Sequence, residues 1–227
     1  MRAPFLNILR PACVVLVLVL ALAAPASATI TTLTFEGLQD LEAIGSYYDG
    51  GLGAMGSGPG PGYGVTFSSN ALAIIDVDAG GSGNFGGEPS PSTILFFLGG
   101  SAATMTYGSG FDTGFSFYYS AINQPGFVNV YDGVNGTGSI LAHLDLPLTP
   151  FSGDPDPNGQ FSPLVPVGVG FAGVAKSIDF GGTINQIGFD NVTFGSQRPT
   201  PGVPEPGTLM LIGTGLAGLL ALRRRSS

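Results

Sequence analysis

Apolar residues along this chain of 227 residues gather in short runs, and they do not recur at helical spacing. The runs are about as long as strands, rich in β-branched and aromatic residues, and bounded by Gly, Pro, Asn or Asp. In the run GFVNVYDG, Phe127 and Tyr131 share one face and Val128 and Val130 share the other, because side chains alternate along a strand. The pattern predicts roughly nine to eleven strands.

Helical periodicity is weak throughout the body of the chain. Leu38, Leu41 and Ile44 recur at every third position, which predicts at most one short helical turn. Without helices to form parallel crossovers, the strands must pair antiparallel and stack as two sheets. We therefore predict an all-β fold, an antiparallel sandwich or jelly roll with long Gly-rich loops. The loops are expected at residues 50–62, 78–92 and 149–163, with a hairpin turn at Asn135-Gly136.

The first 28 residues have the three parts of a secretory signal peptide. Arg2 and Arg10 form a basic region, residues 14–22 form an apolar run, and Ala26 and Ala28 form a small-residue cleavage site. We expect cleavage directly after this site. The alternative is an uncleaved anchor helix.

Charge and cysteine content restrict the function of the mature body. Residues 29–202 carry 14 acidic and two basic residues, a net charge of −12. Such a body repels nucleic-acid phosphates and attracts divalent cations. The only cysteine, Cys13, lies in the signal peptide, so no disulfide or cysteine metal ligand is expected after cleavage.

No set of residues in the sequence has the spacing of a catalytic site. Ser139, His143 and Asp145 occupy alternate positions of one predicted strand, where side chains point in parallel and do not converge as a triad requires. His143 is therefore predicted to lie on a solvent-facing surface. Paired carboxylates for glycoside hydrolysis would have to face one another across a sugar. The sequence does not single out any such pair among its acidic residues, so a glycoside-active enzyme is the least favoured alternative.

Calcium is the one cofactor that the acidic residues suggest. Hard cations take carboxylate and carbonyl oxygens from flexible loops. Asp76 and Asp78, followed by Asn84, Glu88 and several glycines, offer such oxygens, although the EF-hand spacing is not met. An acidic, solvated loop is the alternative.

A second acidic set joins the two ends of the body, with Glu36 in the first predicted strand and Asp190 in the last. This layout resembles β-sandwiches of the carbohydrate-binding-module type, in which acids of the first and last strands hold a structural calcium. The resemblance implies Glu36 and Asp190 as calcium ligands. Binding of extracellular polysaccharide would also need exposed aromatic rings, for which the candidates are Tyr47, Tyr48, Tyr118 and Tyr119.

The C-terminus combines an apolar run with a basic end. Residues 207–222 carry no charge and would span about 24 Å as a helix, slightly less than the ~30 Å hydrocarbon core of a membrane. Arg223, Arg224 and Arg225 would keep this end cytoplasmic. We therefore predict a single transmembrane helix, preceded by a Pro-rich linker at residues 196–202.

The order Val203-Pro204-Glu205-Pro206, apolar helix and Arg-Arg-Arg closely resembles the PEP-CTERM sorting signal of Gram-negative bacteria. The resemblance covers residues 203–227 and implies processing by an exosortase, a membrane-embedded cysteine protease or transpeptidase. The protein would be anchored transiently and then reach the cell surface or the extracellular matrix, in the context of exopolysaccharide and biofilm. A plain tail anchor is the alternative.

Together these features predict four parts: a signal peptide (1–28), a β-sandwich (29–195), a linker (196–202) and a sorting signal (203–227). We expect an exported surface or matrix protein with a structural or adhesive, non-catalytic role. A calcium-stabilised carbohydrate-binding module is the alternative.

Overall fold

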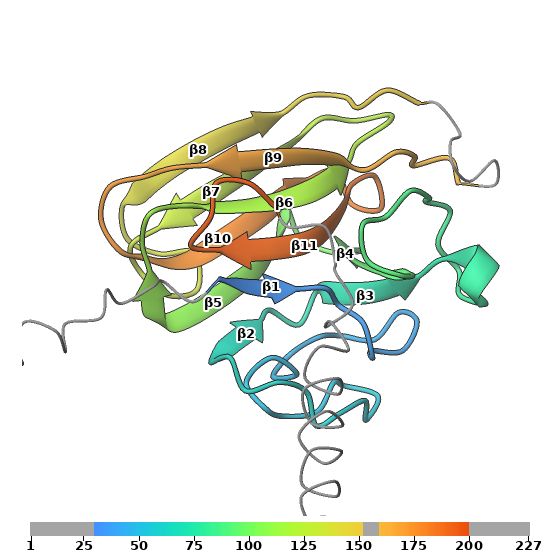
Figure 1. The fold of residues 1–227 in the computed structure, drawn as a ribbon, viewed down its shortest axis with the longest axis horizontal. Coiled ribbons are helices and arrows are strands. Elements are labelled where there is room, and N and C mark those ends of the chain that lie inside the picture. The colour runs from blue at the N-terminus through green and yellow to red at the C-terminus, as the bar shows by residue number, and fades with distance from the viewer. Residues whose placement is uncertain (1–29, 152–158, 200–227) are drawn as a thin grey trace, which may run out of the picture.

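The computed structural model describes residues 30–151 and 159–199, and β-strands dominate it. Eleven strands and one short 3-10 helix fall within these residues. The strands pair antiparallel in two sheets (Figure 1), so the predicted all-β, two-sheet fold is confirmed. In chain order the elements are β1 (Thr31–Leu33), β2 (Val65–Phe67), β3 (Ala71–Ile75), η1 (Val77–Ala79), β4 (Thr93–Phe97), β5 (Ala102–Phe111), β6 (Phe115–Ser120), β7 (Gly126–Tyr131), β8 (Ile140–Leu146), β9 (Val165–Val169), β10 (Ala175–Gly182) and β11 (Gly188–Phe194).

The first and last strands lie side by side, as the sequence predicted. The six-stranded sheet has the order β3-β4-β11-β6-β9, with β1 also paired to β11, and the five-stranded sheet has the order β2-β5-β10-β7-β8. Thr31 pairs with Phe194, and Leu33 pairs with Val192. The two ends of the sandwich therefore lie in the same sheet, which places the residues after β1 next to those of β11.

The core is built mainly from phenylalanine on the inward faces of the strands. Phe117 on β6, Phe180 on β10 and Phe189 on β11 are fully buried. The rings of Phe180 and Phe189 lie 5.1 Å apart, and those of Phe117 and Phe180 lie 5.7 Å apart. Burying a large apolar side chain contributes about 1.5–3 kcal/mol, so rings from opposite sheets hold the two layers together. Of the two faces of β7, the one with Val128 and Val130 belongs to this core.

A two-residue turn joins β7 to β8, as the sequence predicted. Asn135 and Gly136 both have positive φ, at 55° and 68°. The type of turn that matches the twist of two antiparallel strands requires positive φ at both of its central positions. Strands β7 and β8 pair from Gly126 with Leu146 to Tyr131 with Ile140.

The predicted helical turn at residues 38–48 does not form, and this expectation was wrong. Leu41 and Gly45 adopt positive φ, at 61° and 52°, which interrupts a right-handed helix. Leu38 and Ile44 are buried in the core, whereas Leu41 is exposed. The apolar spacing thus reflects an irregular segment that inserts two side chains into the core.

Several sequence-based predictions fall outside the described residues. These are the signal peptide with Ala26 and Ala28, the sorting signal with Val203, Pro204, Glu205 and Pro206, and the basic end at residues 223–225. Within residues 30–151 and 159–199, the structure contains no helix long and apolar enough to cross a membrane.

Candidate functional sites

The structure brings Glu36 and Asp190 into the same region, beside the junction of β1 and β11. Glu36 follows β1, and Asp190 lies within β11 and is fully buried. The pairing of β11 with β6 is irregular between Asp190 and Thr193, where Asn191 has a positive φ of 48°. Bulges of this kind redirect side chains, and this one lies directly next to the buried carboxylate.

Hydrogen bonds join Asp190 to the segment before β4. Its Oδ2 accepts from the Ser90 hydroxyl at 2.7 Å and from the Ser90 backbone N–H at 3.2 Å. Its Oδ1 accepts from the Asn191 backbone N–H at 2.6 Å. The Ser90 hydroxyl is also 3.2 Å from the carbonyl oxygen of Thr34, the residue after β1. These bonds connect β11, β1 and the approach to β4.

Glu36 binds the same segment a few residues further on. Its Oε1 accepts from the backbone N–H groups of Ser92 and Thr93, at 3.0 and 2.8 Å. Its Oε2 accepts from the Thr93 hydroxyl at 3.2 Å. The two carboxylates are far apart in sequence, but both hold residues 90–93 in place, Glu36 from the end of the first strand and Asp190 from the last strand.

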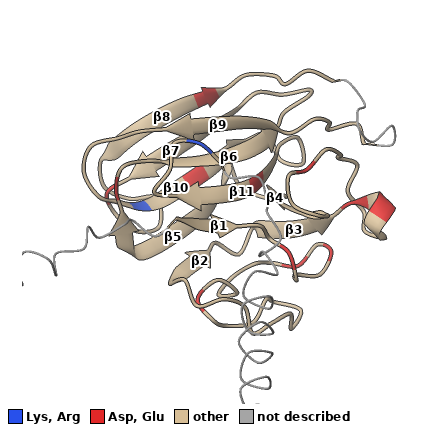
Figure 2. Ribbon diagram, in the orientation of Figure 1, with Lys and Arg blue, Asp and Glu red and all other residues tan. Residues whose placement is uncertain are grey.

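Within residues 30–151 and 159–199, no lysine or arginine forms an ion pair with Glu36 or Asp190. The pKa of Asp190 is raised to about 8, mainly by burial and in small part by the negative charge of Glu36, while hydrogen bonds from Ser90 and Asn191 oppose the rise. Lys176 and Arg198 are the only described lysine and arginine. His143 Nε2 lies 3.2 Å from Asp145 Oδ1, and Figure 2 shows how much acidic positions outnumber basic ones.

The groups around the pair have the chemistry of a hard-cation site. Calcium prefers oxygen ligands. Four groups here offer them: the carboxylates of Glu36 and Asp190, the carbonyl of Thr34 and the hydroxyl of Ser90. A buried carboxylate without a cation is costly, and a bound cation removes that cost. These residues therefore fit calcium, although a site of six to eight oxygens would also need water or further carbonyls.

The other two predicted calcium ligands lie at the 3-10 helix. Asp76 is buried and precedes the helix, and Asp78 lies exposed within it. In the part of the chain that the structure describes, no three Asp, Glu, His or Cys side chains come together as a metal-binding group. Calcium binding by Asp76 and Asp78 stays a prediction.

His143 lies on the outer face of the five-stranded sheet, with half of its side chain exposed. Its Nδ1 is 2.6 Å from Asn129 Oδ1, and its Nε2 is 3.2 Å from Asp145 Oδ1. Ser139 precedes β8, and its backbone N–H donates to Asp132. The histidine and aspartate thus meet on a solvent-facing surface, and the structure gives no contact between Ser139 and His143.

Adjacent strand residues face opposite ways, so at most one tyrosine of each proposed pair could stack on a sugar. The expectation was wrong for Tyr47 and Tyr48, which are both buried. Tyr47, Tyr48 and Tyr119 are 8%, 3% and 5% exposed, and only Tyr118 is partly open. The Tyr48 hydroxyl accepts a hydrogen bond from the Phe35 backbone N–H at 2.6 Å. Tyr47 and Tyr48 lie in an irregular segment that places both side chains in the core, whereas Tyr119 lies on β6.

An aromatic cleft that the sequence did not reveal lies where β1 and β11 of one sheet face β2 and β5 of the other. We call it the Tyr63–Tyr107 cleft. Its volume is about 240 Å³, and Asp112 is its one charged lining residue. Tyr63 stands in a Gly-rich loop before β2, without a periodic pattern around it, and so gave no signal. The cleft is lined by Thr31, Tyr63, Val65, Tyr107, Gly110, Phe111, Asp112, Phe194 and Gly195.

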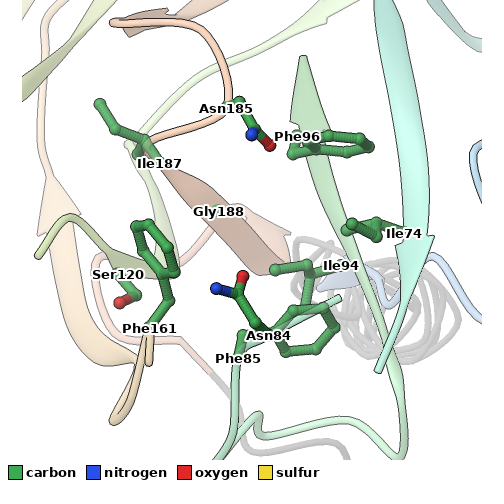
Figure 3. A pocket seen from close by; sticks show the side chains of 10 residues that line it. All are labelled: Ile74, Asn84, Phe85, Ile94, Phe96, Ser120, Phe161, Asn185, Ile187 and Gly188. Atoms are coloured by element: carbon green, nitrogen blue, oxygen red, sulfur yellow. The ribbon is translucent and has the colours of Figure 1, made fainter. Parts of the chain in front are cut away.

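A second, smaller pocket of about 30 Å³ lies over the outer face of the six-stranded sheet. Figure 3 shows Ile94, Phe85 and Phe161 around it, with the amide groups of Asn84 and Asn185 nearby. The buried Ser120 hydroxyl lines the pocket and has no hydrogen-bond partner within the described residues. A pocket of this size has room for water but not for a larger ligand. Neither this pocket nor the Tyr63–Tyr107 cleft is lined by two carboxylates.

Comparison with protein families identifies the C-terminal end of the chain. Residues 202–225 match the PEP-CTERM protein-sorting motif, which confirms the resemblance seen in the sequence. No curated protein matches the chain.

Three solved structures resemble this fold. The K2 cleaved adhesin domain of Lys-gingipain matches with a TM-score of 0.46 and 12% identity, over 75% of this chain and 99% of that one. A glycoside hydrolase family 43 arabinoxylan arabinofuranohydrolase from Bacillus subtilis, in complex with cellotetraose, matches with a TM-score of 0.36 and 16% identity, over 59% and 26%. A carbohydrate binding module from Cellvibrio mixtus lichenase 5A, in complex with cellotriose, matches with a TM-score of 0.34 and 10% identity, over 56% and 88%. All three TM-scores are below 0.5, so no function follows from them.

Proposed function

We propose that this chain, which carries a PEP-CTERM protein-sorting motif, is a surface or extracellular-matrix protein. Its role would be adhesive or structural, in an exopolysaccharide or biofilm matrix. The motif at residues 202–225 implies an exported protein that an exosortase processes, and it is the observation that carries the proposal. Neither described pocket is lined by the pair of acids that glycoside hydrolysis requires, so that activity is not part of the proposal. Its acidity disfavours nucleic acid as a partner.

The proposed route begins with export and ends with release or transfer at the surface. The apolar residues 207–222 hold the precursor in the membrane, and Arg223, Arg224 and Arg225 keep its end cytoplasmic. The exosortase then acts at the Pro-Glu-Pro sequence. The folded sandwich remains outside the inner membrane throughout.

Mass spectrometry of the C-terminus tests this route. In cells with the exosortase, the exported protein should end near Pro206, and in cells without it the arginines should remain. Glu205→Ala should leave the end intact, whereas the matched control Thr208→Ala, outside the Pro-Glu-Pro sequence, should be processed normally. An intact arginine end on exported protein from exosortase-containing cells contradicts the proposal.

We further propose that Glu36 and Asp190 hold a structural calcium, with the Thr34 carbonyl and the Ser90 hydroxyl beside them. The support is the oxygen donors of Thr34 and Ser90 beside the two carboxylates, and the absence of a basic partner for Asp190 among the described residues. A bound calcium would supply the positive charge that the pair lacks. The protein residues fasten β1, β11 and the start of β4 around it.

Thermal unfolding with and without calcium tests this site. If calcium is present at 100 times its Kd, it stabilises the fold by about 2.7 kcal/mol. The Tm of the full chain should therefore be higher in calcium than in chelator, and Asp190→Asn should remove that difference. Asp179→Asn, on the outer face of the other sheet, is the control and should keep it. Equal Tm values for the unaltered chain in both conditions would rule the site out.

A further inference from the structure

We propose that the Tyr63–Tyr107 cleft binds one neutral hexose unit of a polysaccharide. The proposal rests on the matrix role above, because it names the part of the sandwich that contacts the polysaccharide. The cleft combines aromatic faces, which pack against the C–H groups of a sugar ring, with a few polar groups that orient its hydroxyls.

Tyr63 provides an exposed aromatic face in a fixed orientation. Its ring stacks on that of the buried Tyr48, with 6.2 Å between centroids and 12° between planes. Tyr48 is itself held by the hydrogen bond from Phe35. The Tyr63 side chain nevertheless remains 43% exposed. A ring fixed on one side and open on the other loses little conformational freedom when a ligand packs against it.

Tyr107 provides a second ring that buried neighbours hold in place. Its ring is stacked at 6.4 Å on that of Phe111 and lies 6.0 Å from that of Phe194. The ring also lies against the backbone of Gly64, where a Cβ would be in ordinary contact with Tyr107 Cε2 at 3.4 Å. Tyr107 pairs with Val65 in the β2–β5 ladder, which places it near Tyr63 in space.

The polar groups of the cleft select an uncharged ligand. Asp112, exposed directly after β5, offers carboxylate oxygens that accept hydrogen bonds from sugar hydroxyls. One of these oxygens already accepts from the Thr113 hydroxyl at 3.1 Å. Because Asp112 is the one charged lining residue, a uronic acid, sulfate or phosphate would be repelled.

The size of the cleft restricts it to one ring. Its volume of about 240 Å³ is below the range of roughly 300–1,000 Å³ for pockets that enclose drug-sized ligands. The smaller pocket near Ser120, at about 30 Å³, is too small for any sugar. A polysaccharide would therefore be held by a single residue of its chain, and adhesion would require many copies of the protein.

Ligand-detected NMR on the full chain tests the proposal, using methyl β-glucoside, methyl β-galactoside, methyl α-mannoside and methyl β-glucuronide as probes. At least one neutral glycoside should bind with a Kd up to about 10 mM, as expected for a one-ring site. Tyr63→Ala and Tyr107→Ala should each weaken that binding at least tenfold, and Tyr63→Phe should retain it. The glucuronide should bind more weakly than the neutral probe, and Asp112→Asn should reduce the difference.

Tyr131→Ala is the matched control, because this partly buried tyrosine lies on the outer face of the five-stranded sheet. It should bind the neutral probe as the unaltered chain does. The proposal is overturned if no neutral glycoside binds, or if Tyr63→Ala and Tyr107→Ala bind as tightly as the control. Thermal unfolding checks that each variant is folded. Comparing the Kd values of Tyr63→Phe and Tyr63→Ala measures the contribution of the aromatic ring to binding. If the C-terminus is processed normally but no glycoside binds, the sugar site is rejected and the proposed matrix role is not.

Discussion

At the residue scale, isolated carboxylates organise this protein more than ion pairs do. Glu42 is buried and its two oxygens accept from the backbone N–H groups of Gln39, Met55 and Ser57, at 2.7, 2.7 and 3.2 Å. Burial alone would raise the pKa of Glu42, but the hydrogen bonds together outweigh it and the pKa is lowered. The charged carboxylate therefore holds the Gly-rich loop before β2 in place.

Replacing Glu42 should destabilise the fold in a pH-dependent manner. Glu42→Gln places an amide N–H against a backbone donor and should cost about 1–3 kcal/mol in the free energy of unfolding at pH 7. Because the pKa of Glu42 is lowered in the folded state, its stabilisation is complete above the unfolded pKa and disappears as the pH falls through the folded pKa. Denaturant unfolding at several pH values measures this.

The exposed Asp49, in the same loop region, gives the control for Glu42. Asp49→Asn should change the free energy of unfolding by less than about 0.5 kcal/mol. An equal loss for both variants, or a Glu42→Gln effect that stays constant into acid, would contradict the role assigned to Glu42.

Single-residue predictions from the sequence succeeded where the local pattern decides the outcome. Val128 and Val130 share one face of β7, and Asn135 and Gly136 form the turn, because alternation and positive φ are local properties. The exposure of Tyr48 was misjudged, since it depends on how residues 38–63 fold over the edge of the sandwich.

At the element scale, strand pairing depends on turns with specific backbone geometry. Gly136 has a φ of 68° in the β7–β8 turn, and a Cβ there would lie 3.2 Å from Asp179 Oδ1. Its backbone N–H donates to the Ser177 hydroxyl at 2.9 Å, so the turn folds back toward β10. The turn thereby ties three strands of the five-stranded sheet together.

Gly136→Ala should lower stability because a left-handed backbone costs a non-glycine residue about 1–2 kcal/mol. That corresponds to a decrease in Tm of roughly 2–8 °C for a chain of this size. Gly108→Ala is the control, since Gly108 is exposed, lies in β5 and has open space around its Cβ position. Calorimetry that finds equal Tm values for the two variants would argue against strain at the turn.

The strands themselves were predictable and their junctions were less so. Runs of β-branched and aromatic residues define strands locally, and the structure contains eleven of them. The segment with Leu38 and Ile44 was mistaken for a helical turn because apolar spacing cannot distinguish a helix from an irregular segment that buries two side chains. The bulge next to Asp190 gave no signal, since it arises from pairing with a partner strand.

At the scale of the whole molecule, excess negative charge opposes compactness. The body from residue 29 to 202 has a net charge of −12, and only Lys176 and Arg198 are basic. Like charges on a folded surface repel one another, and dissolved salt screens them. Screening shortens the range of interaction from about 30 Å at 0.01 M salt to about 8 Å at 0.15 M.

Stability should therefore rise with monovalent salt. In the presence of chelator, raising NaCl from about 0.01 to about 0.15 M should increase the Tm. If screening lowers the repulsive free energy of the folded state by about 1 kcal/mol, the increase is roughly 2–4 °C. Thermal unfolding in NaCl and KCl checks this, and the two salts should act alike because screening depends on ionic strength. A Tm that falls with salt would mean that attractive charge interactions dominate the fold.

By itself, the sequence determined the fold class, the approximate number of strands and the sorting motif. These follow from alternation, composition and contiguous motifs, which are properties of neighbouring residues. Only the tertiary structure decided that Asp190 is buried beside Glu36 and Ser90, and that Tyr63 and Tyr107 line one cleft. Those arrangements depend on which distant segments meet when two sheets stack, and no local pattern records that choice.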